Sequence, residues 1–305
     1  RAARRRRRAG GRGRGVTGRD AGTVELAHDV HAHDVHEPRT VAEGAAAGGA
    51  PVGDTAAYGT ESPHSPKTAI LLGSLGASRD MWDPQVEALA DKARIITVDL
   101  RGHGESPAPA GDYEMSDLAG DVLALMDSLG VERAHLVGLS LGGAVAQTIA
   151  LENPERIATL TLISTAPKFG ESDAWRDKAA KVRAEGTGVL ADTVVGNWFT
   201  DDCFATNPAL PQRFADGIRA TSDEGYAGCC HAIAGFDSRD RLAEITVPTR
   251  VIAGAEDTST PLDVVTSLCD GIPDSTMTEI SPAKHLVNIE KAEQVNRVLA
   301  MHWGV

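Results

Sequence analysis

The sequence contains no run of about 20 apolar residues, the length that a membrane-spanning helix requires, so we expect no membrane span. Aromatic residues are scarce, at 4% of 305 residues, but 42% of the chain is apolar, enough to bury one large core with an inserted subdomain. Only four cysteines are present, and their spacing matches no metal site: Cys203, Cys229, Cys230 and Cys269. Because the adjacent Cys229 and Cys230 do not readily bond to each other, we expect reduced, mostly buried thiols and a cytoplasmic location.

Acidic residues are missing from the first 19 positions, which carry nine arginines, five of them consecutive from Arg4 to Arg8. The whole chain has a net charge of −13, so residues 20–305 carry −22. An acidic body argues against nucleic-acid binding by the folded domain. The arginines could contact nucleic acid or anionic lipid, but the segment lacks the apolar core of a secretory signal and the chain does not begin with Met. We interpret residues 1–22 as a disordered Arg-rich tail.

Four histidines fall within nine residues and alternate with acidic side chains; they are His28, His31, His33 and His36. A metal site is one interpretation, but no matching ligands follow downstream, so the sequence favours a solvated hairpin without a metal. Residues 24–30 alternate in polarity and predict a first strand. Residues 37–66 are rich in Ala, Gly, Pro and Ser and predict a long flexible insertion.

From residue 67 onward, short apolar segments alternate with helical patterns, which is typical of a parallel β-sheet covered by helices. We expect strands at residues 68–72, 94–99, 134–139, 157–163, 247–253 and 275–280, and helices near 82–91, 116–129, 142–152, 262–271 and 290–302. Strand patterns are missing between about 167 and 240, where helical and loop patterns dominate. The predicted organisation is a core at residues 23–165 and 245–305, interrupted by a mainly helical cap at residues 166–244.

The most informative motif is Gly-Leu-Ser-Leu-Gly at residues 138–142, which fits Gly-x-Ser-x-Gly. An apolar run stops at Ser140, and a run of small, helix-competent residues starts directly after it. This is the strand–turn–helix context of a nucleophile elbow. A serine held in a strained turn tolerates only small neighbours two positions to either side. We therefore predict that Ser140 is a catalytic nucleophile.

The partners of such a serine follow it in the order acid, then histidine. Asp257 lies just past a short buried strand, at the strand end where open α/β sheets place functional groups. Glu256 is the adjacent alternative for the acid. Only His285 and His302 follow Asp257, and His285 lies in a loop whereas His302 lies near the end of a helix. We predict that His285 is the general base and that Asp257 orients it.

An oxyanion hole is also needed, because stabilisation of the tetrahedral intermediate is often the largest catalytic contribution. One donor should be the backbone N–H of Leu141, directly after the nucleophile. The loop that follows the strand at residues 68–72 is the candidate for the other donor, and we assign the N–H of Leu75. An ordinary glycine turn is the alternative for this loop.

Several segments resemble the α/β-hydrolase superfamily: LGSLG at 72–76, MWDPQ at 81–85, DLRGHG at 99–104 and the elbow. More specifically, the chain resembles 3-oxoadipate enol-lactonases of the β-ketoadipate pathway of aromatic catabolism. That similarity is carried by TAPKFG at 165–170, Trp175, NWFT at 197–200, GYAGCCHAI at 225–233 and KHLVNIE at 284–290. The chain departs from the family in having Gly73 for Asn and Lys178 for Arg. The resemblance implies an α/β-hydrolase fold, with a mostly parallel sheet flanked by helices and an inserted helical cap.

The resemblance also implies a serine hydrolase that opens a small anionic enol-lactone to 3-oxoadipate, with no metal or organic cofactor. The carboxylate of such a substrate would need a cation from the cap. The candidates are Lys168, Arg176 and Lys178, and Trp198 could form an apolar wall. The alternatives are another carboxylic ester hydrolase, a perhydrolase or a carbon–carbon bond hydrolase on the same scaffold, or a non-catalytic ligand-binding protein.

Overall fold

The computed structural model describes residues 22–31 and 68–305. Within them, seven strands form one sheet in the order β1-β3-β2-β4-β5-β6-β7. Only the β1–β3 pair is antiparallel in this sheet. The strands are β1 (His28–His31), β2 (Thr68–Leu72), β3 (Arg94–Val98), β4 (Ala134–Leu139), β5 (Ile157–Ile163), β6 (Thr249–Gly254) and β7 (Ser275–Ile280). The predicted fold class, a mostly parallel α/β sheet, is confirmed.

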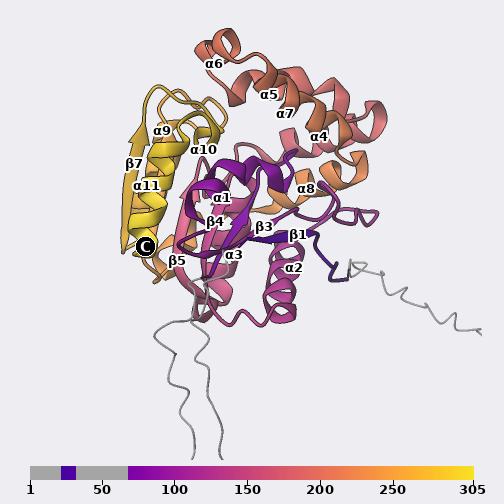
Figure 1. The fold of residues 1–305 in the computed structure, drawn as a ribbon. Coiled ribbons are helices and arrows are strands. Elements are labelled where there is room, and N and C mark those ends of the chain that lie inside the picture. The colour runs from indigo at the N-terminus through magenta and orange to yellow at the C-terminus, as the bar shows by residue number, and fades with distance from the viewer. Residues whose placement is uncertain (1–21, 32–67) are drawn as a thin grey trace, which may run out of the picture.

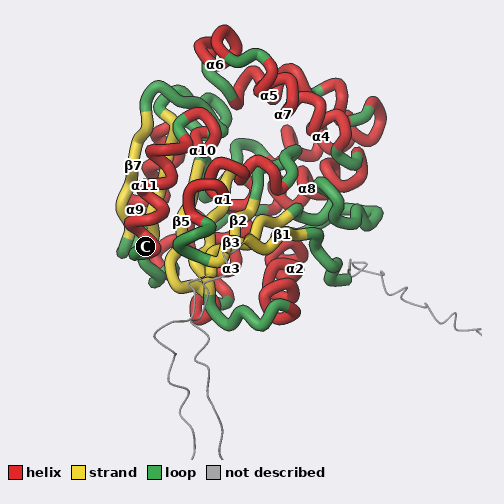
Figure 2. Tube along the Cα trace, in the orientation of Figure 1, coloured by secondary structure: helices red, strands yellow, loops and turns green. Residues whose placement is uncertain are grey.

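Helices cover both faces of the sheet (Figures 1 and 2). Side chains alternate between the two faces of a strand, and in β2 Ile70 and Leu72 join one apolar cluster while Ala69 and Leu71 join the other. The first cluster includes residues of α2 (Met115–Ser128), α3 (Leu141–Glu152) and α9 (Leu262–Gly271). The second includes residues of α1 (Asp83–Leu89), α10 (Val287–Glu290) and α11 (Ala292–Trp303). The strands between the two clusters are therefore buried on both sides.

Several element boundaries differ from the predicted ones by a few residues. The first strand begins at His28 rather than at residue 24, because the amide of Val24 donates to the Asp121 carboxylate and not to a neighbouring strand. The strand expected at 247–253 begins at Thr249, directly after Pro248, which has no N–H to donate to a ladder. The last predicted helix, at 290–302, corresponds to α11, which begins at Ala292, and the separate short helix α10 precedes it.

Five α-helices lie between β5 and β6, and Figure 1 shows them largely on one side of the molecule. They are α4 (Ser172–Glu185), α5 (Ala191–Trp198), α6 (Asp201–Thr206), α7 (Ala209–Ala220) and α8 (Asp223–Gly235). We refer to residues 166–244 as the cap, and the bounds of that unit stay a prediction. The predicted tail, apart from Gly22, and the predicted insertion at 37–66 lie outside the described residues, as do His33 and His36.

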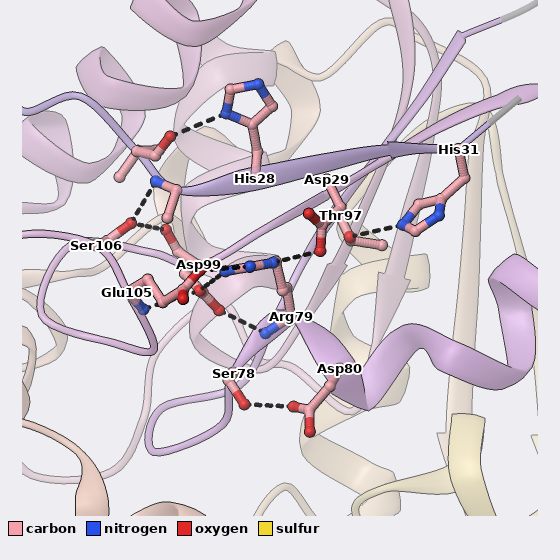
Figure 3. Close-up of polar contacts among 12 residues, drawn as sticks. His28, Asp29, His31, Ser78, Arg79, Asp80, Thr97, Asp99, Glu105 and Ser106 are labelled. Atoms are coloured by element: carbon pink, nitrogen blue, oxygen red, sulfur yellow. Dashed lines mark hydrogen bonds and ion pairs between the residues drawn. The ribbon is translucent and has the colours of Figure 1, made fainter.

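Arg79 joins the first strand to the rest of the sheet (Figure 3). Its guanidinium forms ion pairs with Asp29 of β1, with the buried Asp99 after β3 and with Glu105. A second link runs from the amide of Ala27 to the hydroxyl of Ser106, at 2.8 Å. Among the described residues, no helix is long and apolar enough to cross a membrane.

Candidate active site

Ser140 lies between the end of β4 and the start of α3 in a strained backbone conformation, with φ 83° and ψ −106°. A positive φ is unusual for a residue with a Cβ, and such strain is typical of functional turns. Steric contacts require glycine two positions before and two positions after Ser140. A Cβ at Gly138 would overlap the carbonyl of Gly142, and a Cβ at Gly142 would overlap the carbonyl of Leu72. The sequence pattern is therefore required by the close approach of three backbone segments.

Hydrogen bonds hold this turn against the neighbouring strand. The Ser140 amide donates to the carbonyl of Ile163 in β5 at 3.1 Å. The Ser140 carbonyl accepts from the Ala144 amide at 3.1 Å and from the Thr165 hydroxyl at 2.8 Å. Hydrogen bonds thus fix the backbone on both sides of Ser140.

Asp257 and His285 lie together beyond the ends of β6 and β7. Nδ1 of His285 donates to Oδ2 of Asp257 at 2.8 Å, and both side chains are almost fully buried. Because β4, β5 and β6 are adjacent and parallel, the ends of β4 and β6 lie at the same edge of the sheet. The hydrogen bonds of the described residues include none between Ser140 Oγ and His285, so that contact stays a prediction.

The local environment keeps Asp257 ionised. Burial alone would raise its pKa, but the facing His285 and hydrogen bonds from Thr260 bring the pKa below the ordinary value. Oδ1 accepts from the amides of Ser259 and Thr260 at 2.8 and 3.2 Å, and Oδ2 accepts from the Thr260 hydroxyl at 2.6 Å. An ionised carboxylate can hold the Nδ1–H tautomer of His285 and leave Nε2 free to accept a proton.

The alternative candidates for the acid and the general base, Glu256 and His302, lie outside this pair. Glu256 is exposed, and its amide, not its carboxylate, contacts the histidine loop through the carbonyl of Ala283 at 2.9 Å. His302 lies in α11, where its Nε2 is 3.1 Å from the carbonyl of Leu160. Neither side chain is in contact with the buried Asp257–His285 pair.

The loop that carries His285 passes very close to β6. A Cβ at Gly254 would overlap the carbonyl of Lys284, so glycine is needed at this crossing. The amide of Leu286 donates to the carbonyl of Trp198 at the end of α5, at 3.1 Å. Trp198, predicted as an apolar wall, is buried and packs edge-on against Phe214.

Glu290 is a residue that the sequence analysis missed. Its Oε1 accepts from the amide and the hydroxyl of Thr200 at 2.8 and 2.7 Å. Its Oε2 accepts from the amide of Lys284 at 2.8 Å. The Glu290 carboxylate therefore connects the histidine loop to the start of α6. In the sequence, the only sign of this role is the position of Glu290 in the KHLVNIE motif.

Leu75 lies in the loop after β2, next to the elbow. The amide of Gly142 donates to the carbonyl of Gly73 at 3.0 Å, which joins this loop to the start of α3. The amides on either side of Leu75 are engaged: Ser74 donates to Met81 Sδ at 3.4 Å and Gly76 to His103 Nε2 at 2.8 Å. The hydrogen bonds of the described residues include none from the amides of Leu75 or Leu141, the two predicted oxyanion donors.

The three cap cations differ in their partners. Lys168 lies 3.6 Å from Asp237, and Arg176 forms an exposed ion pair with Asp173 at 2.7 Å. Lys178, on α4, has its Nζ 3.9 Å from the centroid of the Trp175 ring. No ion pair with Lys178 is present in the described part of the chain, and burial lowers its pKa. Of the three, Lys178 is the one without an ion-pair partner among the described residues.

The histidines of the first strand have local partners. Nδ1 of His28 is 3.0 Å from the carbonyl of Leu26, and Nε2 of His31 is 3.4 Å from the Thr97 hydroxyl. Within residues 22–31 and 68–305, no three His, Cys, Asp or Glu side chains are grouped so that they could hold a metal ion. All four cysteines are free thiols, with Cys229 and Cys230 buried.

Comparisons with known proteins agree with this architecture. The family described as alpha/beta hydrolase fold matches residues 69–292. 3-Oxoadipate enol-lactonase 2 of Acinetobacter baylyi is 37% identical over 230 residues, which cover 75% of this chain and 86% of that protein. A protein of Azorhizobium caulinodans whose name proposes a carbamate hydrolase, RutD, is 28% identical over 249 residues, 77% of this chain and 91% of that protein. The solved enol-lactonase from Burkholderia xenovorans aligns with a TM-score of 0.80 at 32% identity, covering 92% of this chain and 97% of that one.

The fold, with a strained serine between a central strand and a helix, is that of a hydrolase, and the chain belongs to the alpha/beta hydrolase fold family. Its similarity to 3-oxoadipate enol-lactonases, first indicated by the cap and histidine-loop motifs, is confirmed.

Proposed function

We propose that this hydrolase opens 3-oxoadipate enol-lactone to 3-oxoadipate, using Ser140, His285 and Asp257. The observation that carries the proposal is the buried Asp257–His285 pair, with its 2.8 Å hydrogen bond, at the sheet edge where β4 ends in the strained Ser140. The substrate class is supported by the similarity to enol-lactonases.

In the first half of the reaction, Oγ of Ser140 adds to the lactone carbonyl carbon while His285 Nε2 takes the hydroxyl proton. The amides of Leu75 and Leu141 stabilise the resulting oxyanion. The ring C–O bond then breaks, and the leaving enolate oxygen receives the proton held by His285. An enol is a better leaving group than an alkoxide, so this protonation is less demanding than in ester or amide cleavage.

In the second half, the opened chain is attached to Ser140 as an ester. The enol oxygen remains tethered nearby and can close the ring again until tautomerisation converts it to a ketone. Water that loses a proton to His285 then attacks the ester carbonyl, and Ser140 recovers its proton as 3-oxoadipate leaves.

Lys178 is the proposed partner for the carboxylate of the lactone. Its ammonium lies on the Trp175 ring and close to Cys230, whose thiol has a pKa raised by burial to about 12 and is therefore neutral. A half-buried ammonium without a protein carboxylate is stabilised when a substrate carboxylate reaches it.

The direct test is the loss of ultraviolet absorbance of enzymatically generated enol-lactone, comparing wild type with Ser140→Ala. Ser164→Ala is the matched control, because Ser164 also follows a central strand with a positive φ, of 44°. We expect fast turnover by wild type and by the Ser164 variant, and none by the Ser140 variant.

A parallel panel of simple esters and carbamates separates the alternatives, since one relative carries a name that proposes carbamate hydrolysis. A wild-type enzyme that cleaves carbamates and leaves the lactone intact would overturn the substrate assignment. Labelling of Ser140 by a fluorophosphonate in that case would retain the nucleophile.

A further inference from the structure

His103 lies in the tight turn after β3, where its side chain is fully buried. Its Nε2 is 2.8 Å from the amide nitrogen of Gly76, and its Nδ1 is 3.2 Å from the carbonyl oxygen of Arg101. An amide can only donate and a carbonyl can only accept. Nδ1 must therefore carry the ring proton and Nε2 must be bare, so the two contacts define a neutral imidazole in a single tautomer.

Gly76 belongs to the loop that carries Leu75, the proposed oxyanion donor. We propose that His103 is a positioning residue for catalysis: by accepting the Gly76 N–H, it holds the neighbouring Leu75 N–H toward the oxyanion of the reaction. This inference rests on the proposed function, because it takes the Leu75 amide as a donor to the tetrahedral intermediate.

The imidazole matters because the other amides next to Leu75 have no comparable acceptor. On the far side of Leu75, the Ser74 amide donates to the sulfur of Met81 at 3.4 Å, and sulfur is a weak acceptor. Gly76 itself has a φ of +84°, a conformation that glycine adopts freely and that does not fix the loop by itself. The imidazole is thus the strongest acceptor that the described residues offer to the amides of Ser74, Leu75 and Gly76.

The turn that carries His103 and the loop that carries Leu75 both pack against α8 of the cap. The backbones of Gly102 and Gly225, the latter in α8, touch so closely that a Cβ on either would overlap the other. At the next residue of α8, the ring of Tyr226 lies against Gly76, where an added Cβ would be 3.1 Å from Cε2. The turn with His103, the loop with Leu75 and α8 therefore pack against one another, which keeps the backbones of His103 and Gly76 close together.

Burial also favours the neutral imidazole. It lowers the pKa of His103, and the Arg101 carbonyl and the Asp99 carboxylate oppose that effect only in part. A neutral ring is what the arrangement requires, because a proton on Nε2 would face the Gly76 N–H.

Three variants test the proposal. His103→Phe keeps an aromatic ring and removes the acceptor. His103→Gln supplies an amide oxygen at about the reach of Nε2. His103→Asn carries the same amide on a side chain one carbon shorter, too short to reach Gly76. The matched control is His135→Phe. His135 lies near the start of β4, at the end of the strand opposite Ser140, and it is also buried, with Nδ1 2.8 Å from the Thr159 hydroxyl.

Each variant is assayed for kcat and KM on the enol-lactone, for the rate of Ser140 phosphonylation by a fluorophosphonate, and for its unfolding midpoint in urea. Misplacing one oxyanion donor costs on the order of 10- to 100-fold in rate. We expect such a loss in kcat and in the phosphonylation rate for His103→Phe and His103→Asn, with KM changed less than about threefold. His103→Gln should keep both rates near those of wild type. The His135 variant should lose stability without this loss of kcat.

Equal kcat in the Gln and Asn variants would overturn the proposal, even if the Phe variant failed to fold. So would a loss of kcat in the His135 variant as large as that in His103→Phe. If wild type ignored the lactone but reacted with the fluorophosphonate, the substrate assignment would fail while the phosphonylation rates still decided the role of His103. A protein inert to both would overturn both proposals.

Discussion

Asp257 receives four hydrogen bonds, and only one of them comes from His285. We predict that Asp257→Asn lowers kcat by roughly 10³- to 10⁴-fold, because an amide that donates to His285 would favour the tautomer with its proton on Nε2. That tautomer cannot accept the proton of Ser140. Steady-state kinetics on the lactone measures the effect.

Glu256→Gln is the control for this prediction, since it makes the same chemical change one residue earlier on an exposed side chain. It should leave kcat within about twofold of wild type, as most exposed substitutions do. A large loss in the Glu256 variant with none in the Asp257 variant would reverse the assignment of the acid.

The proposed contact between the Lys178 ammonium and the lactone carboxylate can be tested by removing either charge. Lys178→Met should raise KM for the anionic lactone by about 10- to 100-fold, since hydrogen bonds to charged groups contribute about 1.5–3 kcal/mol. The methyl ester of the lactone should show little change. Arg176→Met is the control, because the Arg176 guanidinium is already paired with Asp173. Equal KM values for acid and ester in wild type would contradict the role given to Lys178.

The same residue predicts a pH dependence. Because burial lowers the pKa of Lys178, its charge is lost at a lower pH than that of an ordinary lysine. KM for the lactone should therefore rise as the pH increases through that lowered pKa. Lys178→Arg should keep KM flat over the same range, because a guanidinium stays protonated. A KM–pH profile that is identical in the two enzymes would show that another group titrates.

At the scale of elements, Glu290 connects the nearby histidine loop to Thr200, which is 90 residues away in the sequence. Replacing it with Gln keeps the shape but turns one acceptor into a donor that must face the amide of Lys284 or the two donors of Thr200. We predict a loss of about 1–3 kcal/mol in the free energy of unfolding, measured by urea denaturation. The Lys284 amide should also exchange its hydrogen faster, since it loses its acceptor.

Glu293→Gln is the comparison for that measurement, because Glu293 lies on α11 with its side chain 91% exposed. Exposed ion pairs contribute little, so its unfolding free energy should stay within about 0.5 kcal/mol of wild type. If both variants were equally stable, the Glu290 contacts would not fix the histidine loop.

Local sequence patterns predicted the elements well where packing and propensity agree. The strands at 134–139 and 157–163 are apolar throughout or nearly so, and the helix at 262–271 has clear bounds; all three were predicted correctly. The first strand was placed less well, because the Asp121 carboxylate competes for the amide of Val24. The two residues are 97 positions apart, so the local sequence around Val24 gives no sign of this hydrogen bond.

At the scale of the whole molecule, the candidate site also combines features that local sequence predicts with features that depend on long-range contacts. The structure pairs Asp257 with His285, and the catalytic roles of these two residues and of Ser140 stay predictions. All three could be chosen as candidates from a short motif and chain order, because the fold fixes the order of such groups along the chain. The contacts of Glu290 and His103 could not, since each depends on which loops the sheet topology brings together. The order β3-β2-β4 places the loops after three different strands side by side, and a linear pattern does not encode that adjacency.

The net charge of the protein should influence its encounter with an anionic substrate. The chain carries −13 overall, so an anionic lactone approaches a protein of its own sign. Long-range repulsion lowers the rate of encounter and is screened by salt, with a Debye length of about 30 Å at 0.01 M and 8 Å at 0.15 M. In Lys178→Met, which has lost the local attraction, kcat/KM for the lactone should rise about twofold across this range, whereas the methyl ester should show no salt dependence. Wild type should rise less, because salt also weakens the contact between Lys178 and the carboxylate. A fall in kcat/KM for the Lys178 variant would mean that other cations at the site outweigh the charge of the whole molecule.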